Sequence, residues 1–336
     1  MNIYAVLPAP GVRLGLTACI AITVTAAVLS AIPALSRHGL GWLPLAVALG
    51  MVVGNLWPAL PDRGRDGLAI ARGPLMRAGI ALYGLRIGID EFASVGWAGP
   101  LMALAIVAST LLLAQGLGRR LGLDRHSALL IGAGSAICGA AAVAAADGVL
   151  GARARQVSAA VAAVVLFGTL GMYLLPLLRP LLGLSDAAFG LWIGLTVHEL
   201  GHVVAAASAV GPEAATSALI EKMMRVMLLA PAVVWIAFVD GRATKGVRCI
   251  RVPFFLWAFF GAIALNASGL LPAALLSAGG ELAQLLLAVG LAALGAATRL
   301  ADVRAAGSRV WLLAAVLWGY LLVAGFSMVS VLSWLH

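Results

Sequence analysis

Residues 97–117 have the sequence WAGPLMALAIVASTLLLAQGL, a run of 21 residues without a charged side chain. A helix needs about 20 consecutive apolar residues to cross the hydrocarbon core of a bilayer. Similar runs fill almost the whole chain, beginning with Leu14–Ile32. That run is longer than the apolar part of a signal peptide, about 7–15 residues, and is expected to be a retained first helix. The sequence therefore predicts an all-α polytopic membrane protein.

The composition of the 336 residues supports this prediction. Hydrophobic residues make up 63% of the chain and charged residues only 10%, whereas soluble domains have about 25% charged residues. The net charge of +9 comes from Lys and Arg residues scattered at the ends of apolar runs. Nucleic-acid-binding proteins gather such residues on one face, so we expect a lipid bilayer and no nucleic-acid partner. Cys19, Cys138 and Cys249 show neither metal-ligand spacing nor a disulfide framework, and no metal or cofactor is expected.

Charged, proline and glycine residues divide the chain into eleven apolar segments, each predicted to be a transmembrane helix. A polar, arginine-rich loop is expected at residues 58–73, and a short Pro/Gly loop between the sixth and seventh segments. The segments are residues 14–33, 41–57, 74–89, 97–117, 127–148, 156–178, 188–210, 214–239, 253–270, 281–298 and 309–334.

Lys and Arg residues are unevenly distributed when the connecting loops are assigned alternately to two sides. One side receives 16 of the 22 basic residues. Because cytoplasmic loops carry the excess of Lys and Arg, this bias predicts a cytoplasmic N-terminus and, with an odd number of crossings, a C-terminus outside. The other side receives 6 residues: Arg37, Arg86, Arg153, Arg155, Lys222 and Arg225.

Two glycine-rich segments suggest an internal repeat. Gly132–Ala142 in the fifth segment and Gly290–Thr298 in the tenth both look broken by glycine, and both contain Gly-Ala-Ala near the end. Since they are five helices apart, the two halves would run in opposite directions. The sequence thus predicts a single membrane domain with a leading helix and two inverted five-helix repeats. The single domain comprises residues 1–336. Within it the leading helix is expected at residues 1–38, the first repeat at residues 39–180 and the second repeat at residues 186–336.

The fifth segment is the first candidate for a substrate site. Gly132, Gly134 and Gly139 each weaken a helix by about 1 kcal/mol relative to alanine, so the helix is expected to break between Gly132 and Gly139. Ser135 and Cys138 lie in the same interval. The N-terminus of a half-helix exposes backbone N–H groups and a partial positive charge, which suit an anion. Close packing of helices through small residues is the structural alternative.

The seventh segment carries His198-Glu199-Leu-Gly-His202 near its centre. Ionisable residues at that depth are costly and usually functional, so His198 and Glu199 are expected to shape or protonate a site. The same letters match H-E-x-x-H, in which two histidines on one helix face bind zinc. An intramembrane zinc metalloprotease is therefore an alternative, although its third ligand is missing, because Asp147 and Asp240 lie at helix ends. A purely structural hydrogen-bonded cluster is another.

The eighth segment begins with Glu221, Lys222 and Arg225. Glu221 and Arg225 are four residues apart and can pair on one helix face. Long basic side chains near a membrane interface commonly extend to the headgroups. The alternative is that Arg225 or Lys222 turns inward and meets an anion.

These residues resemble the YeiH-like family of uncharacterised bacterial inner-membrane proteins, to which sulfate export is often ascribed. The sequence departs from the family pattern at His202, where that pattern has glutamine, and at Gly201, where it has alanine. The H-E-x-x-H pattern at residues 198–202 thus resembles a local substitution in a transporter motif. The resemblance covers the chain from about residue 40 onward and rests on Leu82-Tyr-Gly84 with Arg86, Gly132–Ala142, Phe167-Gly-Thr169, His198-Glu199 with Val203–Ala206, and Lys222–Met227 with Leu229-Ala-Pro231.

The resemblance implies the architecture of sodium/proton antiporters, bile-acid transporters and auxin-efflux-like carriers, with broken helices that cross near the midplane. It also implies export of sulfate or another small sulfur oxyanion. We therefore expect a secondary transporter of the bacterial inner membrane rather than an enzyme, with a non-transporting scaffold as the remaining alternative and a homo-oligomer left open. The residues expected at the substrate site are Gly132, Gly134, Ser135, Cys138, Gly139, His198, Glu199 and Arg225.

Overall fold

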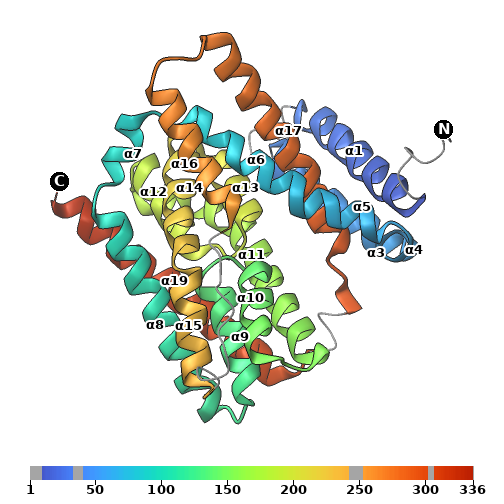
Figure 1. Cartoon of the computed structure of the whole chain (residues 1–336), viewed down its shortest axis with the longest axis vertical. Coiled ribbons are helices and arrows are strands. Elements are labelled where there is room, and N and C mark those ends of the chain that lie inside the picture. The colour runs from blue at the N-terminus through green and yellow to red at the C-terminus, as the bar shows by residue number, and fades with distance from the viewer. Residues whose placement is uncertain (1–9, 33–40, 242–252, 302–305, 336) are drawn as a thin grey trace. The chain divides into compact units, whose positions relative to one another are not determined.

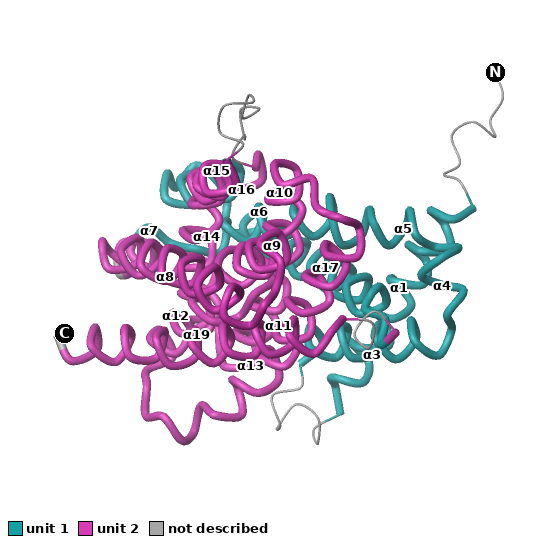
Figure 2. Tube along the Cα trace, turned by 90° about the horizontal axis from the view of Figure 1, so that it is seen from below, with its two compact units in different colours: residues 1–89, 257–300 teal, residues 90–256, 301–336 magenta. Residues whose placement is uncertain are grey.

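The computed structural model describes residues 10–32, 41–241, 253–301 and 306–335. The regular elements of these residues are all helical, as predicted. The chain divides into two compact units (Figure 2), which are described separately. Unit 1 consists of residues 1–89 and 257–300, and unit 2 of residues 90–256 and 301–336.

Unit 1 is built on two helices that pack closely through glycine. A Cβ atom at Gly50 would lie 2.3 Å from the carbonyl oxygen of Ala292, and one at Gly295 would lie 2.2 Å from that of Val47. The two backbones can approach this closely only because neither glycine has a side chain. The helices of this unit are α1 (Pro10–Ser30), α3 (Trp42–Leu56), α4 (Ala59–Arg63), α5 (Arg65–Ile70), the π-helix Ala71–Leu75, α6 (Met76–Tyr83), the 3₁₀ turn Gly84–Arg86, most of α16 (Phe254–Ala267) and α17 (Ala273–Ala297).

Two predictions about unit 1 are wrong. Residues 58–73 are not a loop, because α4 and α5 run through them and Gly67 packs against α1, where its Cβ would lie 2.4 Å from the carbonyl oxygen of Val12. The tenth segment is not broken by glycine either, since α17 is continuous. Its Gly290 and Gly295 allow close packing instead: a Cβ at Gly290 would lie 2.6 Å from the Cβ of Met76.

Unit 2 combines long helices with two pairs of short ones (Figure 1). The short pairs together occupy the predicted fifth and seventh segments. The helices are α7 (Ile89–Val95), α8 (Ala98–Arg120), α9 (Arg125–Ala136), α10 (Ala140–Leu150), α11 (Ala154–Leu182), α12 (Asp186–Thr196), α13 (Leu200–Val210), α14 (Pro212–Met227), α15 (Leu229–Val239) and α19 (Ser308–Leu335).

The first short pair, α9 and α10, is a helical hairpin rather than one crossing helix. The chain breaks at residues 137–139, within the predicted interval, where Gly139 has a φ of 69°. Both ends of the pair lie at the same end of unit 2, because the Gln156 amide, just beyond α10, donates to the Asp124 carboxylate at 2.7 Å. Burial raises the pKa of Asp124, but hydrogen bonds from Ser127 and Gln156 outweigh it and hold the pKa below its usual value.

The second short pair, α12 and α13, is also a hairpin. It breaks at residues 197–199. Helix α13 then runs back to the start of α12, because a Cβ at Gly211, just after α13, would lie 3.4 Å from a carboxylate oxygen of Asp186, the first residue of α12. Each short helix of 11 or 12 residues is about 16–18 Å long, too short for a hydrocarbon core of about 30 Å. The prediction that residues 127–148 and 188–210 are single transmembrane helices is therefore wrong.

The two hairpins enter unit 2 from opposite ends. Helix α11 leaves the end that holds Asp124 and reaches the other end, where Arg179 donates to Asp186 at 2.6 Å. Helices α14 and α15 run back and finish where the Asp240 carboxylate lies 3.2 Å from the His126 ring. Figure 1 shows α12 toward the top of the view and α9 and α15 toward the bottom.

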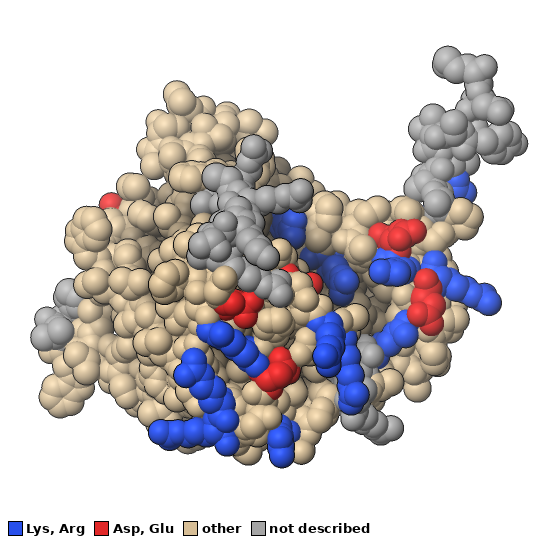
Figure 3. Space-filling view, turned by 60° about the horizontal axis from the view of Figure 1, so that its bottom comes forward, with Lys and Arg blue, Asp and Glu red and all other residues tan. Residues whose placement is uncertain are grey.

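Six described helices are long and apolar enough to cross a membrane. On α8 and α11 many large apolar side chains are exposed, including Leu101 at 64% and Leu177 at 60%. The face shown in Figure 3 carries several groups of Lys and Arg side chains, with Asp and Glu side chains among them. The six spans are Pro10–Ser30, Ala98–Arg120, Ala154–Leu182, Pro212–Val239, Ala273–Ala297 and Ser308–Trp334.

Candidate functional site

The tips of the two hairpins meet inside unit 2. The Glu199 carboxylate, from the tip of the α12–α13 hairpin, accepts a hydrogen bond at 2.5 Å from the backbone N–H of Ala140, the first residue of α10. Gly139 makes room for this contact, because a Cβ there would lie 2.2 Å from the same carboxylate oxygen. Glycine is thus required at this tip both for its positive φ and for the close approach of Glu199.

Arg225 of α14 joins the two hairpins from the side. Its Nε donates to the carbonyl oxygen of Ala136 and its Nη2 to that of Ser135, each at 2.8 Å, and both carbonyls lie at the C-terminal end of α9. Its Nη1 donates to the carbonyl oxygen of Gly194, near the C-terminal end of α12, also at 2.8 Å. The side chain is fully buried. One guanidinium therefore satisfies carbonyl groups of both broken helices.

Lys222, one turn earlier on α14, completes this arrangement. Its Nζ donates to the carbonyl oxygen of Val197, the first residue after α12, at 2.8 Å. Lys222 is fully buried as well, so the interpretation of these basic side chains as extending to the membrane interface is wrong. Both side chains turn inward, as the alternative required, and their contact with an anion stays a prediction.

The charges match the polarity of the half-helices. The C-terminal end of a helix carries partial negative charge and its N-terminal end partial positive charge. Arg225 and Lys222 lie at the C-terminal ends of α9 and α12, and Glu199 lies at the N-terminal end of α10. At the N-terminus of α13 the cap residue Glu199 makes no side-chain hydrogen bond to its own helix. The Glu199 carboxylate thus lies next to the N-termini of both α10 and α13 and accepts a hydrogen bond from α10.

Several buried polar atoms around the tips lack a partner among the described residues. They are Ser135 Oγ on α9 and the Nδ1 atoms of His198 and His202. Cys138, in the tip between α9 and α10, is a buried free cysteine. Unpaired buried polar groups are costly, and a polar ligand at the tips would supply partners for them.

The structure brings together most of the predicted site residues. Gly132 and Gly134 lie farther from the tip on α9 and allow close packing. A Cβ at Gly132 would lie 2.6 Å from Ala114, and a Cβ at Gly134 would lie 2.7 Å from Val164. The predicted pairing of Glu221 with Arg225 has no hydrogen bond in the described structure. Lys222 was not placed at the site, although its position one turn before Arg225 was the available signal. The residues gathered at the tips are Ser135, Cys138, Gly139, His198, Glu199, Lys222 and Arg225.

The H-E-x-x-H string does not lie on one helix. His198 is in the non-helical tip and α13 begins at Leu200, so the two imidazoles are not placed by four residues of continuous helix as a zincin site requires. The expectation that the spacing puts both on one helix face is wrong. His202 lies beside α11, with its Nε2 3.4 Å from the Thr169 hydroxyl. His198 lies beside α11 as well, since a Cβ at Gly168 would lie 2.7 Å from His202 Nδ1 and 3.6 Å from the His198 Cβ. Asp147 and Asp240 accept hydrogen bonds elsewhere, from Ala152 N–H and the His126 ring.

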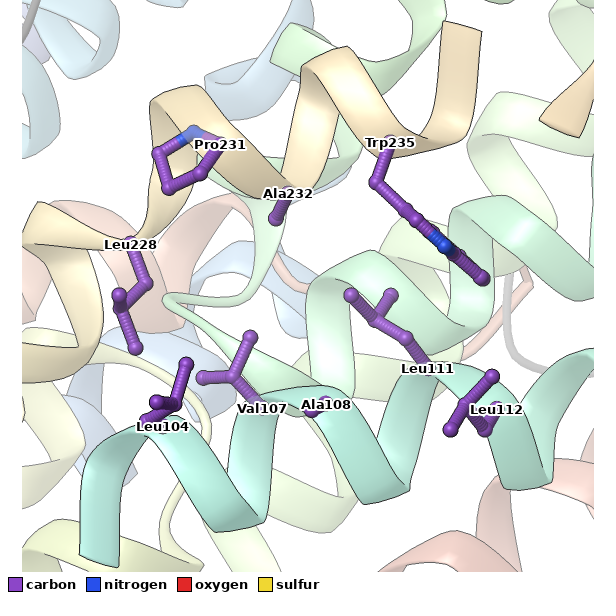
Figure 4. Close-up of a pocket in the computed structure, with 9 residues that line it drawn as sticks. All are labelled: Leu104, Val107, Ala108, Leu111, Leu112, Leu228, Pro231, Ala232 and Trp235. Carbon is purple, nitrogen blue, oxygen red and sulfur yellow. The ribbon is translucent and has the colours of Figure 1, made fainter. Parts of the chain in front are cut away.

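A separate apolar cavity of about 220 Å³ lies between α8 and α15. In Figure 4, Val107 and Leu111 of α8 face Ala232 and Trp235 of α15 across it. No charged residue lines it, so it suits a hydrocarbon chain rather than an anion. Its lining residues are Leu104, Val107, Ala108, Leu111, Leu112, Leu228, Pro231, Ala232 and Trp235.

Comparison with known proteins places the chain in a family. The sequence profile described as "Conserved hypothetical protein 698" matches residues 14–314. The UPF0324 membrane protein PA5383 of Pseudomonas aeruginosa is 44% identical over 305 residues, which cover 87% of this chain and 86% of that relative. The UPF0324 inner membrane protein YeiH of Escherichia coli K12 is 41% identical over 302 residues, covering 88% and 86%. A UPF0324 membrane protein of Yersinia pestis is 42% identical, covering 85% and 83%.

These matches extend over the hairpins and the basic residues of α14. The sequence resemblance is thereby confirmed at the level of the family, and the names of these relatives give a membrane location. Together with the apolar helices, they identify a multi-pass helical membrane protein. The chain belongs to the YeiH-like UPF0324 membrane protein family.

Proposed function

We propose that the protein is a secondary transporter of the bacterial inner membrane that moves a small oxyanion by alternating access. The observation that carries this proposal is the meeting of two opposed hairpins whose tips are held by buried charges. Broken backbone at membrane depth is tolerated where it lines a polar site, and transporters place such half-helix ends at the substrate. The role of a scaffold does not require a buried cluster of Arg225, Lys222 and Glu199, and such a cluster is destabilising because buried charges cost stability.

The electrostatics of the tips favour an anion over a cation. Arg225 and Lys222 contribute two positive charges, and Glu199 one negative charge. The N-terminus of α13 adds a partial positive charge, and its cap residue Glu199 makes no side-chain hydrogen bond to it. A small anion at this helix end would accept from the α13 backbone N–H groups, with Ser135 Oγ and the His198 imidazole as further partners. Arg225 would act by its charge, since most of its N–H groups already bind carbonyls.

The hairpins also sharpen the proposed orientation. If each hairpin returns to the side it entered, the chain crosses the membrane nine times, and a cytoplasmic N-terminus with an outside C-terminus still follows. Arg153 and Arg155 then join the cytoplasmic side and Arg179 moves outside. The cytoplasmic side then has 17 Lys and Arg residues and the outside has 3, which are Arg37, Arg86 and Arg179. Lys222 and Arg225 are buried and belong to neither side.

Cysteine labelling tests this orientation. A cysteine at Arg119 or Arg153 should react only with reagents on the cytoplasmic side, and one at Arg179 only with reagents outside. The original eleven-helix prediction places Arg153 and Arg179 on the opposite sides, so these two positions separate the alternatives. Labelling of Arg119 from outside would overturn both. Arg248, another cytoplasmic position by sequence, lies outside the described residues.

Sulfate and sulfite are the substrates that the family resemblance suggests. A thermal-shift screen of the purified protein tests them, because a ligand that binds the folded state raises the melting temperature by mass action. Sulfate or sulfite should raise it, and chloride at equal ionic strength should not. Equal shifts for all three anions would count against a specific oxyanion site.

A further inference from the structure

Glu221 is a buried carboxyl group that the anion site does not use. It lies on α14, one residue before Lys222, and is fully buried. Both of its carboxylate oxygens lack a hydrogen-bond partner among the residues that the structure describes. Transfer of an ionised carboxylate into such surroundings is far more costly than transfer of the neutral acid.

Two glycines of neighbouring helices face Glu221. From α8, Gly99 faces it, and a Cβ there would lie 3.2 Å from Oε2. From α12, Gly194 faces it, and a Cβ there would lie 2.9 Å from the Glu221 Cβ. The charged groups that act on it are Arg225 and Lys222 of its own helix. Those two side chains are bonded to backbone carbonyls of the hairpins and donate no hydrogen bond to Glu221.

The charge of the cluster depends on this carboxyl. With Arg225, Lys222 and Glu199 ionised, a neutral Glu221 leaves the cluster with a net charge of +1, and an ionised Glu221 leaves it neutral. A net positive charge attracts an anion in a low-dielectric interior. Binding of a proton at Glu221 and of an anion at the hairpin tips therefore favour one another, and by linkage the effect is reciprocal.

We propose that Glu221 is a proton-binding site that couples anion transport to proton movement. The proton binds a carboxylate oxygen of Glu221, the anion binds at the hairpin tips, and both are released when the surroundings of α14 open to water. A metal cation is a poor alternative occupant, because Arg225 and Lys222 would repel it. This inference rests on the proposed oxyanion transport for its coupling, but its proton site can be tested without any substrate.

The first test is infrared spectroscopy of the purified full-length protein in lipid nanodiscs. The parent should show the carbonyl stretch of a protonated carboxyl group at neutral pH, and Glu221→Gln should lose that band. Glu213→Gln is the matched control, since Glu213 is an exposed carboxyl in the first turn of the same helix, and the band should persist. If Glu221→Gln does not fold, Glu221→Asp should shift the band. A band that survives both changes, or is missing from the parent, overturns the proton site.

The second test is the pH dependence of sulfate binding by isothermal titration. In the parent, affinity should fall by about tenfold per pH unit above the titration of Glu221, because one proton is linked to one anion. In Glu221→Gln, affinity should be independent of pH over that range. A variant that keeps the parental pH profile overturns the coupling. Dependence on sodium instead of pH also overturns it. Absence of sulfate binding with the infrared result intact would count against the proposed function and leave the proton site standing.

Discussion

The α9–α10 segment of unit 2 and helix α17 of unit 1 have similar sequences and different structures. Both are rich in glycine and alanine, and both contain Gly-Ala-Ala. The first breaks at residues 137–139, whereas α17 continues through Gly290 and Gly295. In α17 the glycines let neighbouring backbones approach. In α9–α10, Gly139 adopts a positive φ and accommodates the Glu199 carboxylate.

The difference lies in what surrounds the glycines. The break in unit 2 exposes backbone groups that Arg225, Lys222 and Glu199 satisfy. The described neighbours of Gly290 and Gly295 are Met76 and backbone atoms of α3 and of Ala71, which offer no charged partner. Glycine permits a helix to break, and oppositely charged partners at the freed ends stabilise the broken form.

Removal of Arg225 should have the largest effect on this difference. Arg225→Ala leaves buried carbonyl oxygens of Ser135, Ala136 and Gly194 without their donor. Loss of a buried charged partner costs about 3–5 kcal/mol, so we expect the free energy of unfolding in detergent to fall by that amount or the protein not to fold. Arg179→Ala is the control: its ion pair with Asp186 is partly exposed and should contribute about 0–1 kcal/mol. Equal losses in the two variants would show that Arg225 does not hold the break.

Substitution of the tip glycine should have the next largest effect. Gly139→Ala places a Cβ against the Glu199 carboxylate in a backbone conformation that costs a non-glycine residue about 1–3 kcal/mol. We expect a loss of that size or more, measured by thermal unfolding. Gly148→Ala, in α10 with no atom within 4 Å of the new Cβ, should stabilise by about 0.5–1 kcal/mol. A tolerated Gly139→Ala would mean that the break does not need glycine.

Neutralisation of Glu199 should affect binding more than folding. The amide oxygen of Glu199→Gln can still accept from Ala140 N–H, so the hairpins should still meet. The substituted tip has one negative charge fewer next to the N-termini of α10 and α13, and sulfate should bind more tightly by about 1 kcal/mol, several-fold in affinity by isothermal titration. Unchanged or weaker affinity would argue that the anion does not bind near Glu199.

The smallest effect on stability is expected at Ser135. Its hydroxyl has no partner in the described structure, so Ser135→Ala should change the free energy of unfolding by less than about 0.5 kcal/mol. If the hydroxyl contacts the anion, sulfate binding should weaken by about 0.5–1.5 kcal/mol. Ser109→Ala on α8, where the hydroxyl bonds to its own helix, should leave binding unchanged. Equal affinities in the two variants would remove Ser135 from the site. A leucine at Ser135 would overpack this fully buried position.

Helices could be predicted from the sequence because long apolar runs determine them. The ends of α8 and α19, for example, lie within a few residues of the predicted ones. The hairpins could not be predicted, because a chain that enters the membrane and returns has the same apolar content as one that crosses it. The contact between Gln156 and Asp124, which distinguishes the two, joins residues 32 positions apart.

The candidate site could be predicted only in part, because the sequence shows its charged residues but not the groups that they contact. Residues that are costly in a membrane, such as His198, Glu199 and Arg225, are visible in any sequence. Their partners are mostly backbone carbonyls, as Gly194 and Val197 show, and these carry no signature in the side-chain sequence. Glu221 was expected only to pair with Arg225, because its distinguishing property, the absence of a hydrogen-bond partner in the described structure, depends on packing alone.

Flux of radiolabelled sulfate through proteoliposomes tests the transport proposal most directly. Vesicles with the parent protein should release sulfate faster than protein-free vesicles. External sulfite should compete, chloride should not, and Glu199→Gln should alter the concentration at which the rate saturates. Release no faster than from protein-free vesicles, with folded protein and with either sulfate or sulfite inside, would contradict the account and leave the hairpin tips as a structural cluster.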